Sequence, residues 1–561
     1  MVRLPLVTKV LPFYSSDTAV LDLMARHFLR GEFCLYYWGF HYYGVLDPIL
    51  LMPLFRFLGP SPHVSQILPL VFSIVLLFCF HRYVAKIENP MTAHVSTLFL
   101  AAASPSFLQY TFTTYNYVFG PLLGFLFFLL AMAVYERPQD HRKCFLFGLL
   151  SGFAKYYFGL ILFFWVATAA VWWMNCRSEK DHLFAKLPTL RGFWRDRILL
   201  KRYSGHPILK KLLVFVNFIN LGNLLLAAVL WFTGDFVHQF GSQTVKLFFG
   251  PTFKFSLQAG IAVAAVIEWR RLAHFARAFW NHSSGRLFVI GYLLGYSPAL
   301  LGCLVGNFPN VPSGFVPLPQ IWINLKMIVG SICPKLASLS SNTIFAGATV
   351  LLLGGGLVGL FYRLFSLAIL ARQNKPAPRW APMTLLFGIN LVVGLFYMKL
   401  FDVGTTRYFL PAYFSVALGI AYTMQWISRF SRLAAWGLFG LLIANNLSGD
   451  WALLKGQPAR PGFEILADEL LARGCRGGYA DYWTGYRLAA VTNERMIFAA
   501  TGDNNLYPPY LNYARSLDHP VLIEEANSAQ REMVTLQGTN YRVLRRETLA
   551  NTPIAWLEKM P

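Results

Sequence analysis

Long apolar runs alternate with short, charged segments over most of the chain. Most runs approach the ~20 consecutive apolar residues that a helix needs to cross a lipid bilayer. We therefore expect about twelve membrane-spanning helices, of which the run at 144–156 is short enough to cross only part of the bilayer. The expected spans are 65–81, 92–108, 118–135, 144–156, 158–174, 212–232, 253–267, 287–305, 343–362, 382–401, 408–427 and 433–448.

A short amphipathic helix is predicted near the start of the chain. Apolar residues recur at helical spacing between positions 20 and 29. Ser15 or Ser16 can cap the first turn, and Gly31 can end the last one. Asp17 then lies in the first turn, where the helix dipole favours a carboxylate.

A second short helix is predicted at about 48–58, with Asp47 as its N-cap and Gly59 at its end. The strip between the two helices, LYYWGFHYYG, is rich in aromatic residues. Such a strip suits a membrane interface or the faces of sugar rings. Residues 13–64 are therefore expected to lie on a membrane surface, through interfacial amphipathic helices, or to cover a cavity.

The pattern changes again near residue 449, where shorter segments alternate between helix-like and strand-like composition. This alternation predicts a small α/β domain of about 100 residues. We expect three parts in the chain: a first external loop at 1–64, a transmembrane helical domain at 65–448 and an extramembrane α/β domain at 449–561. Within the last part, helices are predicted at 464–474, 509–517 and 528–537, and strands at 477–483, 494–500, 519–526 and 541–546.

Composition supports a polytopic membrane protein rather than one soluble core. Of the 561 residues, 56% are hydrophobic and only 13% are charged. The net charge is +23, an excess that membrane proteins usually carry in cytoplasmic loops. We therefore expect anionic lipid as a partner, and no nucleic acid. The seven cysteines show no spacing typical of a metal site or a disulfide framework.

The positive charges assign the two sides of the membrane. Lys and Arg gather in alternate loops, most densely at 175–211, and these loops share one side if twelve spans are counted. That side is cytoplasmic by the positive-inside rule. This assignment leaves residue 1 outside with no signal to carry it there, so we expect a first membrane helix to be missing from this sequence. The expected external segments are 13–64, 109–117, 233–252, 306–342, 402–407 and the tail from about 449.

Three charged residues are candidates for chemistry. Asp17 lies beside the aromatic strip and could act as a general base, or could be only a first-turn residue. Lys155 lies inside an apolar segment, where a charge is unfavourable and usually has a function. Arg407 begins a membrane helix on the outer side, where the dipole disfavours a cation, although a snorkelling side chain is also an adequate explanation.

Weaker candidates surround them. His41 lies among aromatic residues and is equally well explained as a packed or interfacial side chain, and Asp47 as a helix cap. Asp22 and Glu32 are expected on solvated faces. The loop at 306–342, rich in Pro and Asn, is expected to be irregular and to cover a site. The candidates for substrate binding are His41, Tyr42, Tyr43, Asp47 and Tyr408.

Four segments share their pattern with one family of membrane enzymes. SSDTAVLDLMARHFLRGEFCLYYWGFHYYGVLDPIL, GLLSGFAKYYFG, DVGTTRYFLPAYFSVALG and GYADYWTGYRLAAVTNERMIFAA follow one another along the chain. They resemble the first external loop, two internal segments and the external C-terminal domain of GT-C glycosyltransferases. The similar branch is that of dolichyl-phosphate-mannose mannosyltransferases and the lipid A aminoarabinose transferase. This chain departs from the family in having Asp17 followed by Thr18 in place of an acidic pair, and no carboxylate at 109–117.

The resemblance implies a mostly α-helical, polytopic membrane protein of the GT-C type with an external C-terminal domain. It implies inverting transfer of a sugar from a polyprenyl-phosphate donor to a lipid, glycan or protein acceptor at the periplasmic face of a bacterial inner membrane. Asp17 would take the proton from the acceptor hydroxyl, and Arg407 and Lys155 would bind the donor phosphate. We assign no metal ligands and no cofactor, and leave a role for a divalent metal open.

Two other classes of protein stay open. A transporter or lipid flippase would show repeat symmetry and helices broken by Gly or Pro in matching halves, which this sequence does not show. A non-catalytic scaffold that presents the α/β domain would leave Asp17, Lys155 and Arg407 scattered. The glycosyltransferase interpretation therefore predicts that these three residues meet in one cavity beneath the 306–342 loop.

Overall fold

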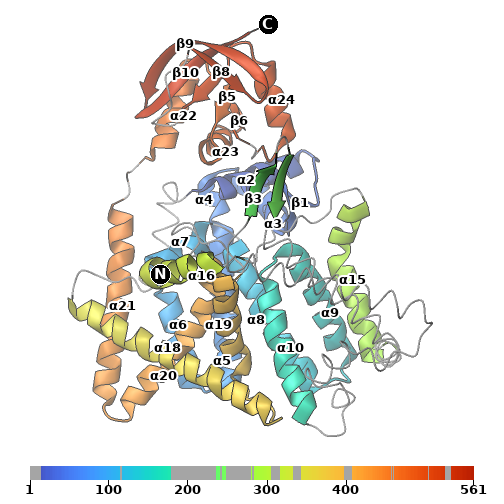
Figure 1. Ribbon diagram of the computed structural model, residues 1–561, viewed down its shortest axis with the longest axis vertical. Helices are drawn as coiled ribbons and strands as arrows, with labels where there is room; N and C mark the ends of the chain where they lie inside the picture. The colour runs from blue at the N-terminus through green and yellow to red at the C-terminus, as the bar shows by residue number, and fades with distance from the viewer. Residues whose placement is uncertain are drawn as a thin grey trace.

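The computed structural model describes most of the chain, and helices dominate the described part. A mixed β-sheet follows the last long helix. Figure 1 shows this sheet at one end of the molecule, a helical bundle at the other, and the elements of the first loop between them. The described residues are 14–113, 116–178, 236–240, 243–247, 280, 283–304, 316, 318–332, 343–396, 407–456, 458, 460–502, 505–524 and 532–560.

Helices occupy the expected spans wherever these fall within the described residues. The spans at 212–232 and 253–267 lie outside them. The run at 92–108 is divided between two helices, α6 and α7, with a break at 102–104. The bundle consists of α5 (Ile67–Ile87), α6 (Pro90–Ala101), α7 (Pro105–Thr113), α8 (Asn116–Glu136), α9 (His141–Tyr157), α10 (Ile161–Ser178), α15 (Ser283–Leu304), α18 (Thr343–Arg372), α19 (Ala381–Phe396), α20 (Leu410–Ser428) and α21 (Arg432–Lys455).

Three helical stretches in the described part are long and apolar enough to cross a membrane: Pro62–Ile87, Tyr117–Glu136 and Ile344–Arg372. Ile161–Asn175 and Ala381–Phe396 are apolar but shorter. The expectation of about twelve full spans is therefore met only in part among these residues, because several helices are too short or too polar by this measure.

The contact between α9 and α15 depends on glycine. A Cβ atom at Gly148 would lie 2.0 Å from the carbonyl oxygen of Phe288, and one at Gly152 would lie 2.1 Å from that of Tyr292. Only residues without a side chain allow two helix backbones to approach so closely. This contact fixes the position of α9, whose last turn carries Lys155 and Tyr157.

The first external loop folds as two packed helices joined by a hairpin. Helix α2 (Ser16–Leu29) begins as predicted, with Ser15 as N-cap accepting a hydrogen bond from the Thr18 amide. The aromatic strip forms the antiparallel strands β1 (Tyr36–Tyr37) and β2 (Phe40–Gly44). Helices α3 (Leu46–Leu58) and α4 (Pro62–Ser65) follow, and Gly59 ends α3 at a φ of 83°.

Two expectations for this loop are wrong. Asp47 is not the N-cap of α3, because the helix begins at Leu46, the cap is Val45, and no side chain closes the first turn. Asp22 does not lie on a solvated face, because it is fully buried and accepts hydrogen bonds from the Tyr14 hydroxyl at 2.7 Å and the Ser65 hydroxyl at 2.9 Å.

The 306–342 loop is not wholly irregular. Residues 318–332 form α16 (Leu318–Met327) and a π-helical turn at Ile328–Ile332. Asn324 connects α16 to the bundle, because its side-chain amide donates hydrogen bonds to the carbonyl oxygens of Gly394 and Leu395 at the end of α19. Residues 305–315 and 333–342 lie outside the described part. Strands β3 (Phe236–Phe240) and β4 (Gln243–Leu247) pair with each other in antiparallel fashion.

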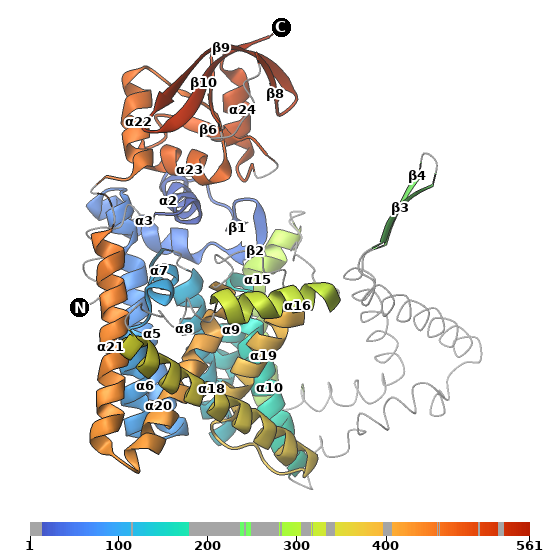
Figure 2. The ribbon, with the colours of Figure 1, turned by 60° about the vertical axis from the view of Figure 1, so that its left-hand side comes forward.

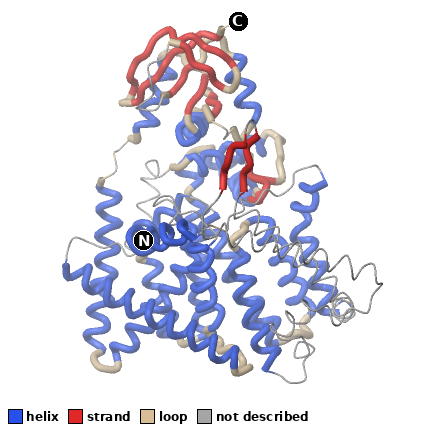
Figure 3. The backbone as a smooth tube through the Cα atoms, viewed as in Figure 1, coloured by secondary structure: helices blue, strands red, loops and turns tan. Residues whose placement is uncertain are grey.

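The C-terminal domain, defined here as residues 460–560, contains a six-stranded sheet in the order β6-β5-β7-β10-β9-β8. Figure 2 and Figure 3 show this sheet at the end of the molecule opposite the helical bundle. The strands β5, β6 and β7 are parallel, and the others pair in antiparallel fashion. Its elements are α22 (Gly462–Ala472), β5 (Gly477–Ala480), α23 (Tyr482–Val491), β6 (Ile497–Ala500), α24 (Pro508–Ser516), β7 (Val521–Ile523), β8 (Met533–Leu536), β9 (Thr539–Leu549) and β10 (Thr552–Lys559).

The prediction of a helix at 528–537 is wrong, because residues 533–536 form strand β8. The turn from β8 to β9 explains the difference. Gln537 and Gly538 have φ values of 50° and 79°, and two successive positive values are typical of the tight turns that join paired strands. Ala550 and Asn551, at 46° and 61°, turn the chain in the same way into β10, which sequence analysis did not predict.

Candidate functional site

A cavity of about 110 Å³ lies where α2, the β1–β2 hairpin and α3 meet the bundle. The wall contains the N-terminal turn of α2, several tyrosine rings, two carboxyl groups and one guanidinium group. Its residues come from α2, the β1–β2 hairpin, the start of α3, helices α8 and α9, and the turn before α20. The lining residues are Asp17, Leu21, Tyr37, Phe40, Tyr43, Gly44, Asp47, Tyr117, Tyr157, Arg407 and Tyr408.

Asp17 stands in the first turn of α2 and is held from three directions. Its Oδ1 accepts a hydrogen bond of 2.7 Å from the Tyr482 hydroxyl. Its Oδ2 lies 3.6 Å from Nη1 of Arg407. The Tyr37 hydroxyl donates to the backbone carbonyl of Asp17 at 3.2 Å. The carboxylate is therefore fixed in orientation while it stays partly accessible from the cavity.

Arg407 lies in a short 3₁₀ turn just before α20, between two aromatic rings. The guanidinium carbon is 5.8 Å from the ring centre of Tyr117 and 5.3 Å from that of Tyr408, which are cation–π distances. Its Nε is buried and has no hydrogen-bond partner among the described residues. The side chain therefore retains donors for an anionic ligand, and guanidinium is well suited to phosphate oxygens.

Lys155 does not line the cavity in which Asp17 and Arg407 meet. It lies half-buried in the last turn of α9, and it is absent from the described residues that line the cavity. The next two residues of the chain do contact the first loop or the cavity. The Tyr156 hydroxyl donates to the Leu35 carbonyl and accepts from the Val45 amide. Tyr157 lines the cavity. The structure thus brings together two of the three charged candidates.

Three of the weaker candidates, Tyr43, Asp47 and Tyr408, line the cavity. His41 and Tyr42 belong to strand β2, and their side chains lie outside the described part of the structure. Asp47 is 2% exposed and accepts a 2.6 Å hydrogen bond from the Tyr157 hydroxyl. Burial raises the pKa of Asp47 to about 7, against the smaller lowering effect of that hydrogen bond.

Sequence reasoning missed Tyr117 and Tyr157 of the cavity wall, and it missed Tyr482, which contacts Asp17. Tyr482 is the first residue of α23, in the C-terminal domain, and Asp481 before it caps that helix by accepting from the amides of Trp483 and Thr484. The segment YADYW was noticed as a motif, but nothing in its spacing indicates which distant residue the tyrosine contacts.

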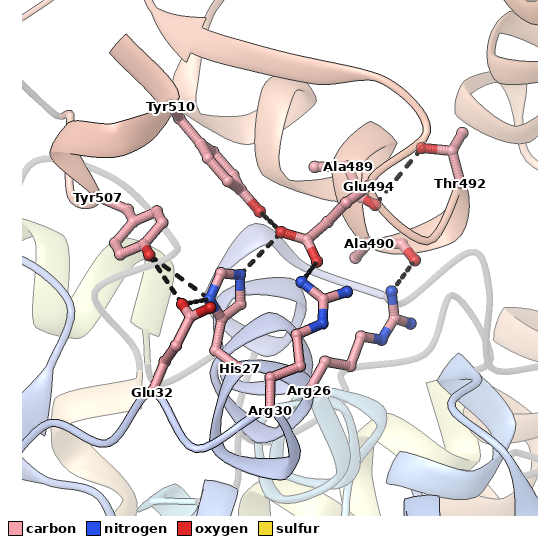
Figure 4. Close-up of polar contacts among 10 residues, drawn as sticks. All are labelled: Arg26, His27, Arg30, Glu32, Ala489, Ala490, Thr492, Glu494, Tyr507 and Tyr510. Atoms are coloured by element: carbon pink, nitrogen blue, oxygen red, sulfur yellow. Dashed lines mark hydrogen bonds and ion pairs between the residues drawn. The ribbon is translucent and has the colours of Figure 1, made fainter. Parts of the chain in front are cut away.

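The C-terminal domain also holds the far end of α2 (Figure 4). Nε2 of His27 lies 2.8 Å from Oε1 of Glu494, and Nη1 of Arg30 lies 2.8 Å from its Oε2. The Tyr510 hydroxyl donates to the same carboxylate at 2.8 Å, and Arg26 donates to the Ala490 carbonyl at 2.7 Å. With the Ser16 hydroxyl bonded to the Trp483 carbonyl near Asp17, both ends of α2 are attached to this domain.

These contacts change the ionisation of the groups that make them. Burial opposes the charged form of Glu494, but hydrogen bonds from His27 and Tyr510 outweigh it and lower the pKa of Glu494 to about 2. Burial likewise opposes the charged form of His27, but hydrogen bonds to Glu494 and Glu32 raise the pKa of His27 above its ordinary value. Glu32, expected on a solvated face, is exposed but engaged in this network.

The cavity does not fit a divalent cation well. Among the described residues, no group of three or more His, Cys, Asp or Glu side chains is arranged to hold a metal ion. The two carboxyl groups of the cavity are Asp17 and Asp47. The first already faces a guanidinium and a hydroxyl donor, and burial favours the neutral form of the second.

Comparison with known proteins gives fold likenesses only. No family model and no curated protein sequence matches the chain. The oligosaccharyltransferase of Archaeoglobus fulgidus, solved in complex with zinc and sulfate, is similar with a TM-score of 0.45 and 12% identity over 91% of this chain. This chain spans 64% of the length of that protein.

ArnT from Cupriavidus metallidurans, solved bound to undecaprenyl phosphate, is similar with a TM-score of 0.34 and 11% identity, covering 96% of this chain and 93% of that one. At such TM-scores these likenesses carry no argument, so the function is inferred from the cavity.

Proposed function

We propose that this chain is a membrane glycosyltransferase that moves a sugar from a polyprenyl-phosphate donor to a hydroxyl group of a lipid, glycan or protein acceptor. The observation that carries the proposal is the approach of Asp17 to within 3.6 Å of Arg407 in a cavity lined by tyrosines. A base, a phosphate-binding cation and aromatic faces for a sugar ring are the groups that such a transfer needs.

In this mechanism Asp17 accepts the proton of the acceptor hydroxyl as its oxygen attacks the anomeric carbon. The bond from that carbon to the phosphate oxygen breaks on the opposite face, and polyprenyl phosphate leaves with the electron pair, so the configuration inverts. Arg407 stabilises the charge that grows on the leaving phosphate. Lys155 is a candidate for an additional phosphate contact from outside the cavity wall.

The proposed location is the periplasmic face of a bacterial inner membrane, with a GT-C type arrangement of about twelve spans and an external C-terminal domain. One observation supports the sidedness. Asp17, Arg407 and Tyr482 lie in three separate segments that loop charges assign to the same external side, and their side chains meet. A divalent metal is not part of the proposed chemistry.

Transfer from labelled undecaprenyl-phosphate sugars by the purified full chain tests the proposal, with Asp17→Asn as the decisive variant. We expect transfer to fall by about 100-fold or more, because general-base catalysis contributes at least that much. Asp468→Asn, which changes an exposed carboxylate of the C-terminal domain, is the control and should keep full activity. Near wild-type transfer by Asp17→Asn would refute the assignment, and donor movement across vesicles without transfer would identify a flippase instead.

A further inference from the structure

Asp47 is a second carboxyl group in the wall of the cavity, and no role in the structure of α3 explains why an aspartate stands at this position. It lies in the first turn of α3, but its side chain makes no cap hydrogen bond. The side chain is nine-tenths or more buried and still lines the same cavity as Asp17 and Arg407. A carboxyl group in such a position is either a defect in the packing or a group that meets a ligand.

The hydrogen bonding of Asp47 distinguishes its two oxygens. Tyr157 donates to Oδ2 at 2.6 Å, so Oδ2 acts as an acceptor. Oδ1 is buried and has no partner among the described residues. If the group is protonated, this arrangement puts the proton on Oδ1, because a carbonyl-type Oδ2 is the better acceptor for the tyrosine. Oδ1 is then an O–H donor without an acceptor.

The surroundings favour that neutral form. The charged groups that share the cavity with Asp47 are Asp17 of α2 and Arg407 before α20, and the titratable hydroxyls are those of Tyr37, Tyr43, Tyr117, Tyr157 and Tyr408. Desolvation is the largest influence on Asp47, as the pKa of about 7 reflects. A single neutral hydroxyl donor is too little to stabilise a buried carboxylate fully.

We propose that Asp47 binds the donor as a neutral acid, donating a hydrogen bond from Oδ1 to a phosphate oxygen of the polyprenyl-phosphate sugar. The proton stays on Asp47 throughout, so no group is transferred by it. An ionised carboxylate here would repel the phosphate anion, whereas a neutral donor gains strength as charge grows on the leaving oxygen. This role rests on the proposed function and differs from that of Asp17, which must be ionised to act as a base.

Binding of undecaprenyl phosphate to the purified full chain, measured between pH 6 and 9, tests the inference without requiring transfer. The binding form is the protonated one, so affinity of the wild-type protein should fall as the pH rises through about 7. Asp47→Asn keeps a neutral N–H donor and an acceptor for Tyr157, so its affinity at pH 8.5 should exceed that of the wild type. Asp47→Ala should bind about tenfold more weakly at pH 6, the usual effect of one charge-assisted hydrogen bond.

The possible results distinguish a neutral hydrogen-bond donor from a required carboxylate and from a bound metal. Equal loss of binding in Asp47→Asn and Asp47→Ala, in variants that melt like the wild type, would overturn the inference by showing that a carboxylate is required. Binding that a chelator abolishes would overturn it in favour of a metal held by Asp17 and Asp47. Undecaprenyl phosphate has a second ionisation of its own at about pH 6, so the wild-type profile is compared with that of Asp47→Asn, and identical profiles would also overturn the inference. If the two profiles differ as expected but no sugar donor supports transfer, the proposed function fails and Asp47 remains assigned only to binding the phosphate.

Discussion

The hydroxyl of Tyr482 donates a 2.7 Å hydrogen bond to the carboxylate of Asp17, from which it is separated by 465 residues. The tyrosine belongs to the C-terminal domain and the carboxylate to the first loop. The hydrogen bond occupies Oδ1 and leaves Oδ2 toward Arg407. The C-terminal domain is therefore part of the proposed catalytic arrangement, because Tyr482 sets the orientation of the proposed base.

Tyr482→Phe should lower the turnover number by about tenfold with little change in the KM for the donor. The ring keeps its packing, and only the hydrogen bond that orients Asp17 is lost, which is worth about 1.5 kcal/mol when one partner is charged. Steady-state kinetics with a labelled donor measure the two constants. Tyr513→Phe, at a half-buried position of the same domain and likewise losing one hydroxyl hydrogen bond, is the matched control. Unchanged turnover in Tyr482→Phe would show that Asp17 needs no such support.

Arg407→Gln should raise the KM for the donor and lower kcat/KM by about 10- to 100-fold, since it removes charge-assisted hydrogen bonds to the phosphate. Arg407→Lys should recover only part of this loss, because an ammonium lacks the planar fork of the guanidinium. Arg542→Gln, at an exposed position of strand β9, serves as a control for loss of a surface arginine. An Arg407→Gln enzyme with normal donor affinity would exclude the phosphate-binding role.

Attachment of the C-terminal domain to α2 should depend on pH. His27 has a raised folded pKa, so its contribution is fully present below pH ~6.5 and is lost as the pH rises through the folded value. Glu494 has a folded pKa of about 2, so its contribution is present above its unfolded value of 4.5 and is lost as the pH falls. The attachment is thus strongest between about pH 4.5 and 6.5.

Hydrogen exchange of the α2 and α23 amides measures this directly. Protection should be greater at pH 5.5 than at pH 8.5 after correction for intrinsic exchange rates. Glu494→Gln should weaken protection at pH 5.5 and reduce its dependence on pH, because one of the two carboxylate partners of the charged imidazole is gone. A wild-type protein protected equally at both pH values would contradict the expectation.

Gly152→Ala should destabilise the bundle by about 1–3 kcal/mol, the usual range for overpacking. The added methyl group would lie 2.1 Å from a backbone oxygen of α15, which cannot move aside as a flexible side chain could. Gly347→Ala, in α18, meets no heavy atom within 4 Å and should be neutral or slightly stabilising. Thermal unfolding in detergent compares the two. A similar loss in both variants would show that the close contact is not responsible, because alanine has the higher helix propensity and should not destabilise an uncrowded helix position.

Local chemistry predicted some parts of this molecule and not others. The start of α2 followed from Ser15 and Asp17, because caps and dipoles depend on adjacent residues. Strand β8 was mistaken for a helix, because the turn at Gln537 decides its pairing and glutamine is not a usual turn residue. These two cases show that patterns of neighbouring residues predict a helix cap but do not predict how a strand pairs.

The sequence indicated only some of the residues that form the candidate site. Asp17 and Arg407 stood out because a charge beside apolar sequence is rare enough to notice. Asp47 was interpreted as a helix cap, because an aspartate before a proline has that ordinary explanation, which the helix start at Leu46 removes. Tyr482 could not be paired with Asp17, because only the docking of α23 on α2 brings them together.

The attachment of α2 to α23 has a consequence for how the protein is made. The ribosome synthesises the proposed base 465 residues before its hydroxyl partner. A nascent or prematurely terminated chain therefore carries Asp17 without the group that orients it. If Asp17 is the base, such unfinished copies should transfer sugar more slowly than the chain that includes α23.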